Sequence, residues 1–179
     1  MTTPIKQPEV KIKDNIVVYF LASSDPLDIE ACKTVHNHLS QFIRNSKPTI
    51  EIYSDYAIEG GDDRTIYKDK LYASDLVIVF GSSSFIADED LSTNRINKVI
   101  LRYNNRETRI LAIIVRNFLW ELPFFGNLPI LPKVKKPLYD QKTWSIDDAF
   151  TTVAQEIKEK LTKIYKIEQS TIEIKPWDD

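Results

Sequence analysis

Two short polar stretches of this 179-residue chain hold residue types that catalytic and binding sites use. Gly81 and Ser82–Ser84 directly follow an apolar run, and open α/β sheets bind ligands at the carboxyl ends of their strands. Asp88, Glu89 and Asp90 come next and could supply a general acid or a metal ligand. Each stretch also has a structural interpretation, as a serine turn that caps the next helix or as favourable charge at its N-terminus. We favour the structural interpretation for both.

A third polar stretch, at 54–63, is an acidic loop longer than a connection between two elements needs. Long loops in compact domains are often functional, although a solvated turn explains this one equally well. Its charged residues and glycines are Asp55, Glu59, Gly60, Gly61, Asp62 and Asp63.

Several familiar chemistries have no support in the sequence. Neither a dinucleotide-binding G-x-G-x-x-G motif nor a P-loop is present. His36 and His38, the only histidines, would point about 200° apart on a helix and cannot share a metal ion. Cys32 lies on an apolar stripe and is best interpreted as a core residue. We therefore predict no metal site, no disulfide and no catalytic triad.

The composition predicts one globular domain in the cytoplasm. Hydrophobic residues make up 42% of the chain, and its 24 basic and 26 acidic residues give a net charge of 24 − 26 = −2. That near-neutral total argues against nucleic-acid binding, because such binding depends on neutralising phosphates. The best candidate membrane segment, 117–132, is interrupted by three prolines. We expect neither a nucleic acid nor a membrane as partner.

The elements that must position these polar stretches alternate between strand and helix. Apolar runs at 15–21, 49–53, 76–80 and 109–115 predict strands, and the polar alternation within 49–53 places that strand nearer an edge. Apolar residues repeat at helical spacing through 29–43, 96–103 and 150–165. This order predicts an α/β fold with a parallel sheet. We expect burial of Val17, Val18, Val77, Ile78, Val79, Ile113, Ile114, Phe150, Ile157 and Leu161.

The order of these segments resembles that of a TIR (Toll/interleukin-1 receptor) domain of the bacterial stand-alone or effector-associated type. The stretch VVYFLASSD at 17–25 resembles the family's first strand and turn, and 53–63 its second strand and BB loop. ASDLVIVFGSSSFIA at 73–87 is similar to the strand and serines before the family's third helix. Further similar pieces are Trp120–Pro129, Leu131-Pro, Lys136-Pro, Trp144 and Asp148-Ala-Phe.

The resemblance covers about residues 14–162 and implies a flavodoxin-like, doubly wound sheet of five parallel strands with helices on both faces. Its fifth strand would be 137–139. Because the two ends of the chain differ in pattern from the rest, we expect an N-terminal arm or linker at 1–13, a TIR-like domain at 14–166 and a tail or short extra strand at 167–179.

Members of this family either cleave NAD+ with a glutamate of the third helix or act as assembly modules. Counting from Phe85, the glutamate position holds Asn94, which cannot act as a base or stabilise a cation by charge. We expect Asn94 on the first turns of the third helix, beside the ligand pocket. On this argument the sequence favours a module that acts by protein–protein assembly in a bacterial defence or signalling system.

The charge pattern offers such a module two surfaces. Arg95, Lys98 and Arg102 recur at steps of three and four and predict one basic face, although a solvated helix face is the commoner case. The acidic loop is its candidate complement, and opposite patches on one chain permit head-to-tail association with a second TIR-like chain.

The alternative hypothesis is an NAD+ hydrolase or cyclase, with NAD+ as substrate and no other cofactor. Its pocket would be formed by Ser23, Ser24, Ser82 and Ser83. Glu89 or Asp90 would then have to supply the missing carboxylate. The observation that separates the two hypotheses is whether a carboxylate lies at the pocket.

Overall fold

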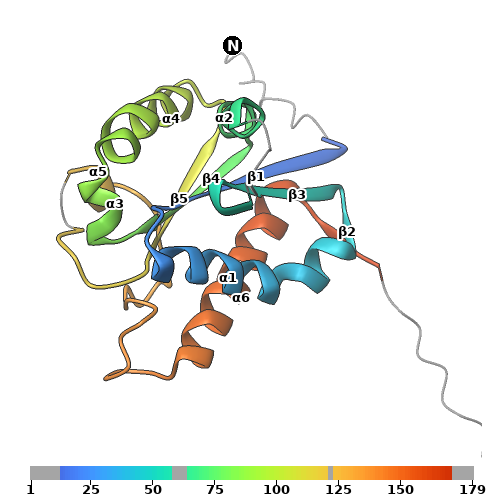
Figure 1. The fold of residues 1–179 in the computed structure, drawn as a ribbon. Helices are drawn as coiled ribbons and strands as arrows, with labels where there is room; N and C mark the ends of the chain where they lie inside the picture. Colours follow the sequence, from blue (N-terminus) through green and yellow to red (C-terminus); the bar gives the residue numbers. More distant parts are fainter. Residues whose placement is uncertain (1–12, 58–63, 121–122, 171–179) are drawn as a thin grey trace, which may run out of the picture.

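A computed structural model describes residues 13–57, 64–120 and 123–170 of the chain. Within these ranges five parallel strands form one sheet in the order β3-β1-β4-β5-β6 (Figure 1). This is the flavodoxin-like α/β fold that the resemblance implies. The strands are β1 (Asn15–Leu21), β3 (Thr49–Ser54), β4 (Leu76–Gly81), β5 (Arg109–Ile114) and β6 (Ile130–Leu131).

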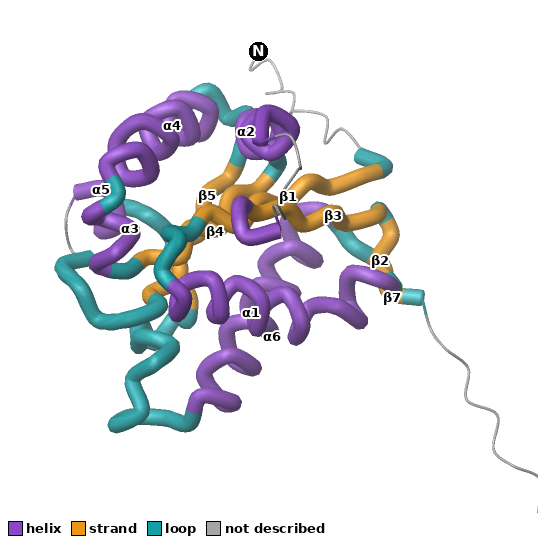
Figure 2. Tube along the Cα trace, viewed as in Figure 1, coloured by secondary structure: helices purple, strands orange, loops and turns teal. Residues whose placement is uncertain are grey.

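Helices cover both faces of the sheet, so the described chain has three layers (Figure 2). The helices α1 and α6 pack on one face, and α2, α3, α4 and α5 contribute to the core on the other. Their bounds are α1 (Pro26–Arg44), α2 (Arg64–Ala73), α3 (Ser83–Ala87), α4 (Ile96–Asn104), α5 (Pro123–Gly126) and α6 (Ile146–Tyr165). None of these described helices combines the length and apolar character needed to cross a lipid bilayer.

Local sequence signals account for where the two longest helices begin. Asp25 caps α1, accepting a hydrogen bond from the Leu27 N–H at 2.9 Å, and Pro26 occupies the first helical position. Ser145 caps α6, accepting from the Asp148 N–H at 3.1 Å. These caps fix where each helix enters the layer beneath the sheet.

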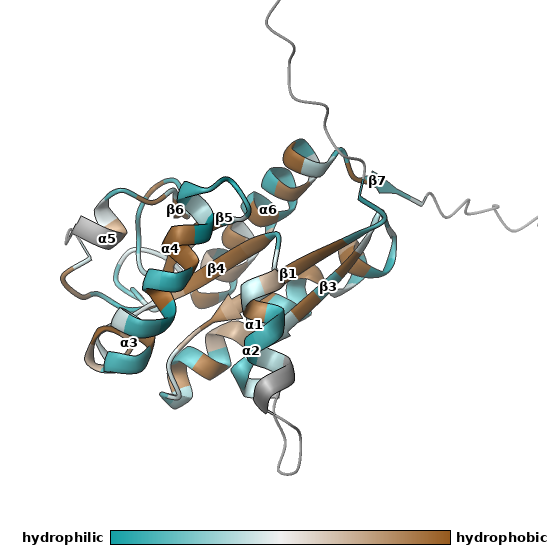
Figure 3. Ribbon diagram, turned by 90° about the horizontal axis from the view of Figure 1, so that it is seen from above, coloured by the Kyte–Doolittle hydropathy of each residue, from teal (hydrophilic) through white to brown (hydrophobic). Residues whose placement is uncertain are grey.

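The strand side chains alternate between two hydrophobic clusters, as parallel strands covered on both faces require. Ile78 and Phe80 of β4 point toward α1 and α6, whereas Val77 and Val79 point toward α2–α4. Figure 3 shows the hydrophobic central strands between helices whose outer sides are polar. Nine of the ten residues expected in the core are buried. Val17, near the start of β1, is partly exposed.

The fifth strand lies at Ile130–Leu131, so its assignment to 137–139 is wrong. The segment Leu138–Tyr139 does lie along the sheet, because its two N–H groups donate to the carbonyls of Ile114 and Val115 at 2.9 and 3.1 Å. This segment continues beyond the last residue of β5 and does not form a regular ladder of strand hydrogen bonds with it. Two residues between Pro129 and Pro132 are too short a strand for a hydrophobic pattern to reveal.

The C-terminal segment contributes a short extra strand. β7 (Glu168–Gln169) pairs in antiparallel fashion with β2 (Ser46–Lys47), which precedes β3. Ile167 is buried in the core cluster of α1 and α6. Residues 167–169 therefore pack with the domain, in line with the short extra strand that was one of our two alternatives for this segment.

An irregular helical segment joins α3 to α4. Residues Asp90–Arg95 form a π-helical turn, in which the Ile96 N–H bonds to the carbonyl of Leu91, five residues earlier. A π turn holds more residues than an α turn, so it changes which side chains face inward. A second irregular piece, the 3-10 turn Asp55–Ala57, follows β3.

Candidate functional site

The strand order identifies the ligand-binding edge of the sheet. The strand of this sheet that follows β1 in the chain, β3, lies on one side of β1, and the next, β4, lies on its other side. The order of the strands therefore reverses between β1 and β4. In open α/β sheets, ligands bind in the crevice outside the carboxyl ends of such strands. Ser23 and Ser24 follow β1, and Ser82 and Ser83 follow β4.

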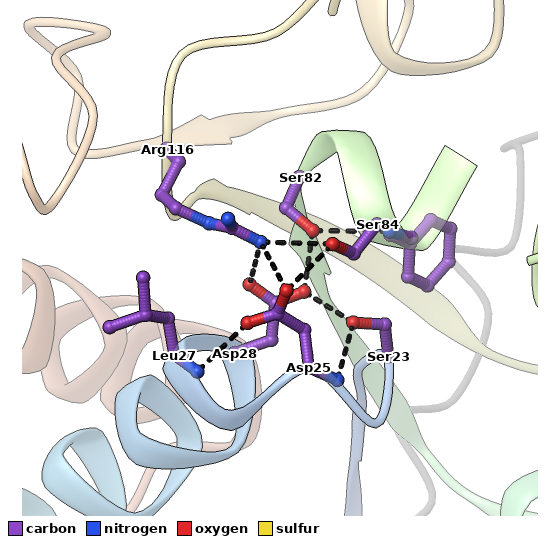
Figure 4. A network of polar contacts seen from close by, with 8 residues as sticks. Ser23, Asp25, Leu27, Asp28, Ser82, Ser84 and Arg116 are labelled. Atoms are coloured by element: carbon purple, nitrogen blue, oxygen red, sulfur yellow. Dashed lines mark hydrogen bonds and ion pairs between the residues drawn. The ribbon is translucent and has the colours of Figure 1, made fainter. Parts of the chain in front are cut away.

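A buried carboxylate ties these strand ends together (Figure 4). Asp28, in the first turn of α1, is fully buried and accepts hydrogen bonds from the hydroxyls of Ser23 and Ser82. Ser82 also caps α3, since its hydroxyl oxygen accepts from the Phe85 N–H at 3.1 Å. The helix-capping interpretation of the serine turn is therefore confirmed. Ser83 is exposed.

Arg116 lies two residues after β5, so the network also includes the end of a strand other than β1 and β4. Its guanidinium lies 3.2 Å from Asp28 and 3.3 Å from Asp25. Hydrogen bonds from the Ser84 hydroxyl and the Leu27 N–H, together with Arg116, hold the pKa of the Asp25 carboxyl below its ordinary value. The Arg116 Nε is buried and has no hydrogen-bond partner among the described residues.

A cavity of about 420 Å³ opens beside this network. Apolar, hydroxyl, acidic and basic side chains line this cavity. Such a mixture suits a polar small molecule that carries a ring. The described lining residues are Phe20, Ala22, Ser23, Ser24, Ile29, Asp55, Tyr56, Lys68, Asp88, Asp90, Leu91 and Arg95.

The wall of the cavity contains an internal ion pair that the sequence analysis did not foresee. Both terminal nitrogens of Arg95 donate to the Asp55 carboxylate, and the Tyr19 hydroxyl donates to the same carboxylate. The Arg95 side chain is 9% exposed, and its Nε lacks a partner within the described chain. Burial and the negative charge of Asp55 raise the pKa of Tyr19. Burial alone would lower the pKa of Arg95, but Asp55 and Tyr19 outweigh it and raise that pKa.

This ion pair contradicts the prediction that Arg95, Lys98 and Arg102 form one basic face. Arg95 points into the molecule and pairs with Asp55, which we had assigned to the opposite, acidic surface. Lys98 is exposed and its ammonium lies 5.2 Å from the ring centre of Tyr72. Arg102 is half-buried and pairs with Glu107 at 3.5 Å. The remaining loop residues of the prediction, Glu59, Gly60, Gly61, Asp62 and Asp63, lie outside the described residues.

Carboxylates do lie at the cavity, but not at the position that the family motif indicated. Asp88 and Asp90 both line it, whereas Glu89 is exposed and does not. Asn94 is exposed on the π-helical turn and is not among the described residues that line the cavity, although it lies next to one of them, Asp90. Its amide approaches Asp90 Oδ1 at 3.4 Å. Leu91 and Arg95 of the same segment are buried and line the cavity.

Sequence reasoning missed the charged partners of the network, Asp28 and Arg116. The end of a predicted strand gave a usable signal for Arg116, since it follows β5 just as the serines follow β1 and β4. Asp28 carries no comparable signal, because an acidic residue in the first turn of a helix is common. No group of three or more His, Cys, Asp or Glu side chains in the described chain is arranged to hold a metal ion.

The chain is similar to one curated protein, the uncharacterized protein y4lF of Sinorhizobium fredii (strain NBRC 101917 / NGR234), with 27% identity over 117 residues. The similarity covers 64% of this chain but 35% of y4lF, so the chain spans about a third of that relative's length. No family model matches the chain, and no solved structure matches it. Inference about its function therefore begins from the cavity at the ends of β1 and β4.

Proposed function

We propose that this chain is a TIR-like signalling domain that binds a nicotinamide-bearing ribosyl compound of the NAD+ class and cleaves its N-glycosidic bond. The observation that carries the proposal is the pair of carboxylates, Asp88 and Asp90, in the lining of the cavity. The sequence argument against an enzyme is that Asn94 stands at the position of the family's catalytic glutamate. Since Asn94 lies outside the lining, its identity does not decide the chemistry.

The proposed reaction needs little more than a positioned carboxylate and water. The bond between the ribose C1′ and the pyridinium nitrogen breaks, and its electron pair leaves with nicotinamide. A carboxylate beside C1′ stabilises the resulting oxocarbenium ion, as carboxylates do in glycoside hydrolysis. Water then adds to C1′ and loses a proton to the carboxylate. Asp88 is half-buried and its Oδ1 accepts from the Leu91 N–H at 3.1 Å, so its position is fixed.

The experiment is incubation of the protein with NAD+ and separation of nicotinamide by chromatography, for wild type, Asp88→Asn and Asp90→Asn. We expect loss of about 10²-fold or more for at least one variant, the usual effect of removing a catalytic acid or base. Glu89→Gln is the matched control, because Glu89 lies between the two but outside the lining, and it should leave the rate unchanged. Absence of nicotinamide release from wild type, or equal rates in all four proteins, would contradict the proposal.

A second proposed function is assembly with another TIR-like chain through the outer face of α4. The observation that favours it is the exposure of a large apolar side chain there, Leu101, which is 63% exposed and lies three residues after the exposed Lys98 on the same face. Lys98, on the same helix, adds an exposed charge. Exposed apolar surface of this kind often marks a protein interface.

Sedimentation velocity at increasing protein concentration tests this second proposal. We expect wild type to associate and Leu101→Ser to remain monomeric, while Val134→Ser, with a side chain that is similarly exposed but belongs to the segment after β6, behaves as wild type. A wild-type protein that stays monomeric at high concentration and low salt refutes it.

A further inference from the structure

We infer that the cavity selects an N-ribosyl ligand without a pyrophosphate, because the chain's own carboxylates neutralise the N-terminus of α1 and Arg116 at this edge of the sheet. The inference rests on the proposed function and narrows its substrate class from nicotinamide nucleotides in general to the nucleoside end of that series.

The N-terminus of α1 is the first of these groups. A helix N-terminus that faces the switch point of an α/β sheet usually holds a phosphate with its free N–H groups and positive dipole end. Here Asp25 accepts the Leu27 N–H at 2.9 Å, and Asp28 lies fully buried in the same first turn. Two negative charges of the chain thus occupy the place of the anion.

Arg116 is the second group. It is the cation that follows β5 at this edge, and its guanidinium contacts both Asp25 and Asp28 within 3.3 Å. Figure 4 shows the two carboxylates converging on it from the start of α1. A phosphate that approached this guanidinium would meet the negative charge of both carboxylates.

The charged side chains that line the cavity are also negative in sum. Three carboxylates face two cations there, and one of those cations, Arg95, is paired with Asp55. Lys68 is exposed at the lining and enters no ion pair within the described residues. The carboxylates of Asp88 and Asp90 suit a cationic pyridinium ring and ribose hydroxyls, which donate hydrogen bonds. The same field repels the two negative charges of a pyrophosphate.

The experiment compares nicotinamide riboside, nicotinamide mononucleotide and NAD+ as ligands of the full chain. Binding is measured by calorimetry and cleavage by nicotinamide release, so that ligand class and chemistry are tested separately. We expect the riboside to exceed NAD+ by roughly tenfold or more in affinity, and in kcat/KM where cleavage occurs. The mononucleotide should fall between them.

A variant tests the cause of this preference. Asp25→Ser keeps a good helix cap but removes one of the two carboxylates on Arg116. We expect it to shift the ratio of riboside to NAD+ affinity several-fold toward NAD+. Asp147→Ser makes the same change of charge in the exposed first turn of α6 and should leave the ratio unaltered.

The outcomes separate this inference from the proposed function. Preferential binding of the riboside without nicotinamide release supports the inference and refutes the cleavage. Equal or tighter binding of NAD+ overturns the inference, whether or not cleavage occurs. Binding of none of the three compounds overturns both.

Discussion

Replacing Asp28 by alanine should destabilise the protein more than any other single polar change in the network. The buried carboxylate accepts from Ser23 and Ser82 and pairs with Arg116 at 3.2 Å. Removing one partner of a buried ion pair costs about 3–5 kcal/mol, and a buried polar group left without a partner about 1–3 kcal/mol. The hydroxyls can rotate, and the Arg116 side chain is 26% exposed and keeps Asp25. We therefore expect a loss of about 3 kcal/mol, at the low end of the first range.

Urea unfolding followed by far-UV circular dichroism measures this loss, and an unchanged slope with denaturant would show that the unfolded state is unaffected. For a domain of this size, about 3 kcal/mol corresponds to a fall in Tm of roughly 6–12 °C. Asp147→Ala is the control, since Asp147 is exposed in the first turn of α6 and should cost about 0.5 kcal/mol or less. An Asp28→Ala loss below about 1 kcal/mol would refute the reasoning.

Three further changes test the core, the packing at the strand end and the pH response. Ile78→Ala, in fully buried β4, should cost about 2–5 kcal/mol by urea unfolding, and a loss below about 1 kcal/mol would mean that the strand is misassigned. Gly81→Ala should cost about 1–3 kcal/mol, because its Cβ would lie 2.9 Å from ring atoms of Phe118 and Phe125; an unchanged Tm would contradict this. Burial lowers the pKa of His36, so its neutral form stabilises the fold above the unfolded-state pKa, and this stabilisation is lost as pH falls through the folded-state pKa. His36→Gln should therefore lose less stability than wild type between about pH 7 and pH 5, whereas the exposed His38→Gln should follow wild type.

Sequence patterns formed by residues close together in the chain predicted the fold well. The runs at β1, β4 and β5 are long and rich in β-branched residues, so their burial on both faces could be predicted directly. β6 could not, because its two residues are held by the neighbouring β5 and carry no periodicity of their own. Its place depends on tertiary pairing.

The candidate site was predictable only in part, because pairings between distant residues decide it. The helical spacing that assigned Arg95 and Lys98 to one face does not reveal that Arg95 pairs with Asp55, 40 positions earlier in the chain. The pairing of Asp28 with Arg116 joins residues 88 positions apart, so it follows from the strand order and not from any local motif. Ser23 and Ser24 line the cavity, and they directly follow a strand that the sequence does reveal.

The two edges of the sheet bear on how this domain can aggregate or polymerise. An edge strand with free N–H and C=O groups invites another chain to extend the sheet. β6 is two residues long and lies between Pro129 and Pro132, which have no N–H to donate. β3 carries the exposed charge of Glu51 near its middle. Both described edges thus carry features that discourage strand addition. We expect chains of this protein to meet through their helices and not to pair through the edge strands of their sheets.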